Sequence, residues 1–175
     1  MANREALREL QSRLALRLQQ ARTETRVQSW LAIECAGLGL LVPLPTAGEI
    51  FPVSSLQPVP HTQPWFMGVA NLRGGLHGVV DLAAFLGLRK PIARDAVREH
   101  AQLLSFNAAQ GSNCAVLVDR LAGLRSATQL TAEADDGQSR PAFAGARWRD
   151  AEQRIWQEID LAALARNEQF LAIAA

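Results

Sequence analysis

The first part of the chain has the hydrophobic periodicity of an amphipathic helix. Leu7, Leu10, Leu14 and Leu18 recur every three or four residues within residues 3–26, where six arginines and three glutamates occupy much of the remaining surface. This spacing predicts a helix with one apolar face. Such a helix can dock on its own domain, bind a partner helix or lie on anionic lipid, and its mixed charge disfavours the lipid.

From residue 27 onward, short apolar runs alternate with turn residues, which predicts β-strands. Residues 26–37 and 38–50 form one pair of runs, and residues 64–72 and 75–82 form a second pair that meets at Arg73. Further strand-like runs cover residues 101–108, 113–124, 126–130, 143–149 and 154–161. Many short strands favour one or two small β-barrels with helices at the ends, the last of them over residues 161–174.

The segments between these runs help to divide the chain. A short helix is predicted after Asp81, which would be its N-cap, and Gly87 would end it. Residues 88–100 are polar and predict an exposed loop, and residues 131–141 predict an acidic loop. We therefore expect a helical extension over residues 1–26 and one folded domain over residues 27–175.

Composition and charge argue against several classes of protein. The chain has 175 residues, 49% of them hydrophobic and 20% charged, with a net charge of +1, so neither disorder nor general attraction to nucleic acid is expected. No apolar stretch approaches the roughly 20 residues of a membrane span, and the N-terminus lacks a secretory apolar core. Cys35 and Cys114 lie in apolar runs, which indicates buried free thiols and a cytoplasmic protein, unless their strands meet to form a disulfide.

A search for catalytic groups finds no convergent set. His61, His77 and His100 are scattered without metal-ligand spacing, and the chain has no G-x-S-x-G elbow and no phosphate-binding loop. Asp81 and Asp119 can be interpreted as an acid–base pair, although each follows an apolar run where aspartate commonly bonds local backbone N–H groups. We expect no enzyme activity, no cofactor and no metal.

Arg73 is the most informative single residue. It lies in A-N-L-R-G-G-L-H-G-V-V-D-L, residues 70–82, between an apolar run and two glycines. Because the segment joins two predicted strands, it offers no helix N-terminus for a phosphate. Two interpretations remain, an exposed protein-recognition residue and an ion pair with a carboxylate of the same fold.

The sequence around Arg73 resembles the central signature of CheW-like domains. An apolar strand, a G-V-x-N-L-R-G turn, a strand ending in V-D-L and a short helix follow in that order. Residues 49–50, E-I, and residues 114–124, C-A-V-L-V-D-R-L-A-G-L, are similar to further parts of the family pattern. The matching signature positions are Gly68, Val69, Asn71, Leu72, Arg73, Gly74, Val80, Asp81 and Leu82.

The resemblance implies an all-β fold of two five-stranded SH3-like β-barrels, here with an added N-terminal helix and a C-terminal helix. It also implies a non-catalytic adaptor that couples methyl-accepting chemoreceptors to a CheA-type histidine kinase through the kinase's CheW-like domain. The residues that would bind the receptor are Asn71, Leu72, Arg73 and Gly74, with Glu49 nearby. The overall pattern is most like the PilI-type adaptor of type IV pilus systems for twitching motility, which is cytoplasmic and recruited to membrane-bound receptor arrays.

Some positions depart from the family pattern. His77 and Gly78 replace an apolar residue and a proline, and Ala47 stands where a valine is usual. Two other functions remain as alternatives. One is a CheW-like regulator that blocks the receptor or the kinase, and the other is a small metal-dependent hydrolase that uses His77, Asp81 and Asp119.

Overall fold

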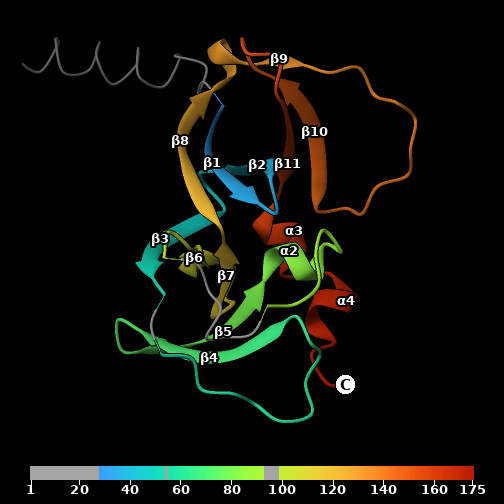
Figure 1. Cartoon of the computed structure of the whole chain (residues 1–175). Coiled ribbons are helices and arrows are strands. Elements are labelled where there is room, and N and C mark those ends of the chain that lie inside the picture. Colours follow the sequence, from blue (N-terminus) through green and yellow to red (C-terminus); the bar gives the residue numbers. More distant parts are fainter. Residues whose placement is uncertain (1–27, 54, 93–98) are drawn as a thin grey trace, which may run out of the picture.

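The chain folds into two β-sheets with a few short helices. Figure 1 shows the computed structural model, which describes residues 28–53, 55–92 and 99–175. The expected helix over residues 3–26 lies outside the described residues. None of the helices in the described part is long and apolar enough to cross a membrane.

The strands belong to two sheets, and sheet A contains both the first and the last strands. Sheet A has the strand order β8-β1-β2-β11-β10-β9 and sheet B the order β3-β6-β7-β5-β4. Sheet A contains β1 (Ser29–Cys35), β2 (Leu38–Pro43), β8 (Arg120–Ser126), β9 (Thr131–Ala132), β10 (Ala144–Arg149) and β11 (Ile155–Ile159). Sheet B contains β3 (Ala47–Pro52), β4 (Phe66–Leu72), β5 (Gly75–Asp81), β6 (Gln102–Phe106) and β7 (Cys114–Val118). The α-helices among the described residues are α2 (Leu82–Phe85), α3 (Leu161–Leu164) and α4 (Glu168–Leu171).

Two parallel pairings follow from this order. The chain begins in sheet A, forms the whole of sheet B and returns, so that β11 pairs in parallel with β2 while β5 pairs in parallel with β7. In Figure 1 the strands of sheet A lie above those of sheet B, and α2, α3 and α4 lie beside them.

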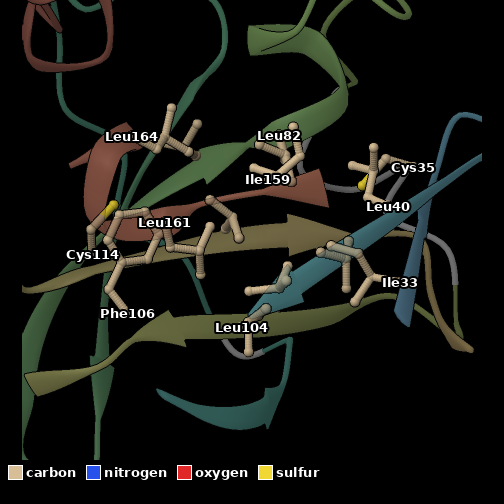
Figure 2. Packing of buried hydrophobic residues seen from close by; sticks show 14 of the residues in the cluster. Ile33, Cys35, Leu40, Leu82, Leu104, Phe106, Cys114, Ile159, Leu161 and Leu164 are labelled. Atoms are coloured by element: carbon tan, nitrogen blue, oxygen red, sulfur yellow. The ribbon is translucent and has the colours of Figure 1, made fainter. Parts of the chain in front are cut away.

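A core shared by the two sheets holds the molecule together. Ile33 and Leu40 from sheet A pack in one cluster with Leu104 and Phe106 from sheet B, and α3 adds Leu161 (Figure 2). Each sheet also has a second buried cluster, around Trp30, Ala32, Leu41 and Trp156 in sheet A and around Leu72, Val79, Leu103 and Leu117 in sheet B.

These clusters explain why some strands are apolar at every position. In β7, Cys114, Val116 and Val118 belong to the shared core, whereas Ala115 and Leu117 face the second cluster of sheet B. Successive side chains of a strand point to opposite faces, so a strand covered on both sides needs a continuous apolar run.

The expectation of a mostly β fold in two parts is confirmed, and its details are corrected. Sheet A has six strands rather than five because the two-residue β9 adds to β10. Within the described part of the chain, no strand pairing joins the two edges of either sheet, so neither is a five-stranded barrel closed by backbone hydrogen bonds.

Several predicted elements are divided. Residues 38–50 form β2 and β3 in different sheets, and residues 113–124 form β7 and β8, again in different sheets. The strand predicted at residues 126–130 is mainly a 3-10 turn, Ala127–Gln129. The C-terminal helix is two four-residue helices, α3 and α4, because Asp160 and Asn167 each cap a new start.

Candidate functional site at the β4–β5 hairpin

A tight two-residue loop presents Arg73 at the tip of the β4–β5 hairpin. Leu72 pairs with Gly75, which leaves Arg73 and Gly74 as the loop, with φ values of 49° and 83°. Two positive φ values define the type I′ geometry that matches the twist of antiparallel strands. The side-chain Oδ1 of Asn71 accepts a hydrogen bond of 2.8 Å from the N–H of Gly74. Asn71 and Gly74 therefore shape the turn.

The backbone of Arg73 is in a conformation that arginine disfavours. Turns of this type favour asparagine, aspartate or glycine at this position because the Cβ of other residues is crowded when φ is positive. A non-glycine residue held there stores strain of order 1 kcal/mol, and such strain gathers at functional sites. The geometry of the turn does not require an arginine, so the exposed guanidinium must have another reason.

The first glycine of the signature also has a steric cause. Gly68 has a φ of 124°, and a Cβ at this position would lie 2.2 Å from the carbonyl oxygen of Gln57. The closeness is needed because Gln57 exchanges two backbone hydrogen bonds with Val69, at 2.8 and 2.9 Å. Gly68 thus lets the preceding segment run along β4 and support the hairpin.

Arg73 forms an exposed ion pair with Glu49. One Nη atom of Arg73 lies 2.8 Å from an Oε atom of Glu49, and the two side chains are 75% and 53% exposed. Glu49 lies on β3, at the opposite edge of sheet B from β4. Sheet B therefore curls until side chains near its two edges meet, although their backbones do not pair. Exposed pairs add at most about 1 kcal/mol to stability, so both groups remain accessible to a partner.

A hollow of about 320 Å³ lies behind the ion pair. It is lined by Glu49 and Arg73 and by His77, whose Nδ1 is 3.0 Å from the carbonyl oxygen of Gly75. Buried Ser105 fixes the Glu49 backbone: its Oγ accepts from the Glu49 N–H at 2.8 Å and donates to the Glu49 carbonyl at 3.1 Å. The carboxylate is thus carried on a firmly held strand.

Two large apolar side chains lie exposed on the same strands. Leu76 on β5 is 64% exposed, and Ile50, next to Glu49, is 41% exposed. Because neighbouring side chains of a strand point to opposite faces, Ile50 and Leu76 lie on the faces opposite to Glu49 and His77. We call Glu49, Asn71 and Arg73 the hairpin surface.

Not every predicted site residue lies on this surface. Leu72 is only 4% exposed and belongs to the second core cluster of sheet B, so it anchors the hairpin from inside.

Asp81 and Asp119 converge on one arginine. Arg89 lies 2.8 Å from an Oδ of Asp81 and 3.2 Å from an Oδ of Asp119. Asp81 also caps α2 by accepting from the Ala84 N–H at 3.2 Å, and Asp119 accepts from the Ala36 N–H at 2.7 Å. The interpretation as a partner of local backbone N–H groups is confirmed for Asp81, whereas Asp119 bonds the N–H of Ala36, which is distant in the sequence. Sequence reasoning missed Arg89, because nothing local links it to Asp119.

The groups considered for metal or thiol chemistry are placed as follows. Within the described ranges, no three His, Cys, Asp or Glu side chains gather as metal ligands. Cys35 and Cys114 are free and buried, as predicted. Burial raises the pKa of each thiol to about 12, so both stay protonated at neutral pH.

Comparisons with known proteins agree with this architecture. The family model described as CheW-like domain matches residues 29–169. Among solved structures, the chain is similar to the scaffolding protein TtCheW from Thermoanaerobacter tengcongensis, with a TM-score of 0.64, 15% sequence identity and coverage of 79% of this chain and 88% of that one. At this identity the likeness concerns the fold. A comparison with curated proteins found no match.

Proposed function

The chain belongs to the CheW-like domain family, and on this basis we propose that it is a non-catalytic adaptor between methyl-accepting chemoreceptors and a CheA-type histidine kinase. The hairpin surface is the proposed receptor-binding site. Asn71 and Gly74 hold the turn, Leu72 anchors it, and Arg73 with Glu49 provides the charged contacts.

One observation carries this proposal. Arg73 is exposed and occupies a strained backbone position where asparagine or glycine would be more stable, and its ion pair adds little stability in return. A guanidinium with several free N–H donors is among the groups that contribute most to protein–protein binding. A binding role accounts for the arginine where folding does not.

The finer assignment follows from the resemblance of the overall pattern to PilI-type adaptors. We propose that the protein works in a chemosensory system for type IV pilus twitching motility. It would then be cytoplasmic and recruited to membrane-bound receptor arrays, with no direct insertion into the membrane.

Co-sedimentation of the full chain with a receptor signalling fragment and with the kinase tests the receptor site. Arg73→Glu is expected to weaken receptor binding by about tenfold or more, equivalent to about 1.4 kcal/mol or more, and to leave kinase binding unchanged. Arg166→Glu, a charge reversal at another exposed arginine, serves as the matched control. Unchanged receptor affinity of Arg73→Glu would remove Arg73 from the site.

A charge swap separates recognition from internal stabilisation. The double variant Glu49→Arg/Arg73→Glu rebuilds the ion pair with reversed polarity. If Arg73 contacts the receptor, the swap stays defective, whereas recovery of binding would mean that only the internal pair matters. Kinase activity in the ternary mixture then tests coupling, because an adaptor raises receptor-dependent activity and a blocking regulator lowers it.

A further inference from the structure

A second concave surface lies on sheet A, away from the hairpin surface. It is a cleft of about 500 Å³ over the face of sheet A that carries Trp30 and Trp156. Arg120 and Arg125 of β8 lie along one side, and Arg154, directly before β11, lies on the other. None of these arginines is a matching position of the central signature around Arg73 or a residue of the receptor site proposed above.

The three arginines are held in place by Glu34 and Trp156. Arg120 donates two hydrogen bonds to the Glu34 carboxylate, at 2.8 and 2.9 Å, and Arg154 donates one at 2.6 Å. The guanidinium carbon of Arg154 lies 4.5 Å from the centre of the Trp156 ring and that of Arg125 lies 5.6 Å from it. Stacking on an indole orients a guanidinium before any ligand arrives.

Hydrogen-bond donors exceed acceptors in this cleft. Each guanidinium has five N–H donors, yet Arg120 directs two at Glu34, Arg154 directs one at Glu34, and Arg125 directs one at the Leu124 carbonyl. Most donors therefore have no acceptor among the described residues. Arg125 is the clearest case, because within the described part of the chain its guanidinium donates to the Leu124 carbonyl and interacts with the Asp150 carboxylate without a hydrogen bond to it.

The acidic groups in the cleft are mostly occupied. Both Glu34 oxygens accept from arginine, and although burial raises the pKa of Glu34, the bonds from Arg154 and Arg120 lower it overall. One Asp150 oxygen accepts from the Trp156 indole N–H at 2.8 Å and the other from the Glu152 and Arg154 N–H groups at 2.9 Å. Glu152 is exposed on the turn between β10 and β11. Of the three carboxylates that line the cleft, only that of Glu152 accepts no hydrogen bond from a described residue, whereas most N–H donors of the three arginines are unused.

The cleft also borders an open sheet edge. β8 is the edge strand of sheet A, and its outer backbone groups pair with no strand among the described residues. In Figure 1, β8 runs along the outside of the molecule. Edges of this kind accept extended segments of other proteins, so the shape favours a peptide over a compact small molecule.

We propose that this cleft binds an extended acidic segment of a partner protein, whose carboxylates accept hydrogen bonds from Arg120, Arg125 and Arg154. Arginine binds carboxylates through paired, charge-assisted hydrogen bonds, which supply both affinity and orientation. Because the net charge of the chain is only +1, such binding depends on these arginines and not on a general attraction for anions.

Fluorescence anisotropy with a labelled hexaglutamate peptide tests the proposal on the full chain. Arg125→Met keeps the aliphatic stem and removes the donors, and it is expected to weaken peptide binding by about tenfold. Arg166→Met, at an exposed arginine outside the cleft, is expected to bind like the unaltered chain. A hexaglutamine peptide is expected not to bind, and amide chemical-shift changes caused by hexaglutamate should cluster in β8 and at Arg154.

Three results would overturn the proposal. The first is an absence of hexaglutamate binding, and the second is equal affinity of Arg125→Met and Arg166→Met. The third is inorganic phosphate that binds the cleft as tightly as the peptide, which would identify a site for a free anion. Because receptor binding is measured separately with Arg73→Glu, failure of one proposal leaves the other standing.

Discussion

At the scale of single residues, Arg73 occupies a turn position whose backbone geometry disfavours arginine. Its φ of 49° suits asparagine better, and its exposed pair with Glu49 contributes at most about 1 kcal/mol. We expect Arg73→Asn to raise the free energy of unfolding by up to about 1 kcal/mol, measured by urea denaturation, while receptor binding falls.

A matched variant isolates the backbone effect. Arg73→Val loses the same ion pair but places a β-branched residue where φ is positive, so we expect it to be less stable than Arg73→Asn. If the asparagine and valine variants unfold at the same urea concentration, backbone strain does not govern this position. Stability gained at the expense of binding is the pattern expected where a residue serves function.

The two buried thiols predict how stability changes at alkaline pH. Burial raises the pKa of Cys35 and Cys114 to about 12, whereas the ordinary value of 9.0 applies in the unfolded chain. Between these values the folded state binds more protons than the unfolded state does. The stabilisation by each protonated thiol is therefore fully present below pH 9 and is lost as pH rises towards 12. At about pH 10, the loss is about 1.4 kcal/mol for each thiol.

Urea unfolding at neutral pH and near pH 10 measures this loss. The variant Cys35→Ala/Cys114→Ala has a cavity cost that does not depend on pH, so its stability should fall less between the two conditions than that of the unaltered chain. Equal falls would mean that the thiols do not titrate as burial implies.

At the scale of elements, local signals predicted local features well. The β4–β5 hairpin, the cap of α2 by Asp81 and the apolar strands all agree with the sequence. The missed boundaries lie where the chain passes from one sheet to the other. At Asp119 the apolar pattern runs directly from β7, which is buried at every position, into β8, which is partly buried, and only Asp119 separates them. Which sheet a strand joins depends on distant partners.

The pairing of β11 with β2 shows the same dependence. A Cβ on Gly39 would lie 2.6 Å from the Trp156 ring, so the bare glycine lets the indole lie over β2. The two residues lie opposite each other in a parallel pairing that a sequence pattern does not reveal. The position of Trp156 in turn places Arg125 and Arg154, which is why the cleft on sheet A could not be predicted.

At the scale of the whole molecule, the sequence predicted which residues form the candidate site but not how they come together in space. The signature around Arg73 named the residues, and the resemblance placed Glu49 nearby. The contact between them depends on the curl of sheet B, which brings a strand edge and a hairpin tip together from distant parts of the sheet. Curl arises from twist summed over several strands, and no short stretch of sequence encodes it.

Arg89 links the two sheets and gives the last prediction. Asp81 ends β5 in sheet B and is only 1% exposed, whereas Asp119 joins β7 to β8 and accepts from Ala36 in the β1–β2 turn of sheet A. Arg89→Met leaves Asp81 buried without its counter-charge. Because breaking a buried pair by removing one partner is costly, we expect a loss of about 3 kcal/mol in the free energy of unfolding.

The loss of stability should affect both sheets at once, because they share one core. Tryptophan fluorescence reports mainly on sheet A, where Trp30, Trp148 and Trp156 lie, and far-UV circular dichroism reports on both sheets. We expect the two signals of Arg89→Met to shift together along the urea axis, with Arg89→Lys intermediate since it keeps the charge and loses the paired geometry. Separate fluorescence and dichroism transitions would instead mean that the sheets unfold independently and that Arg89 stabilises only one of them.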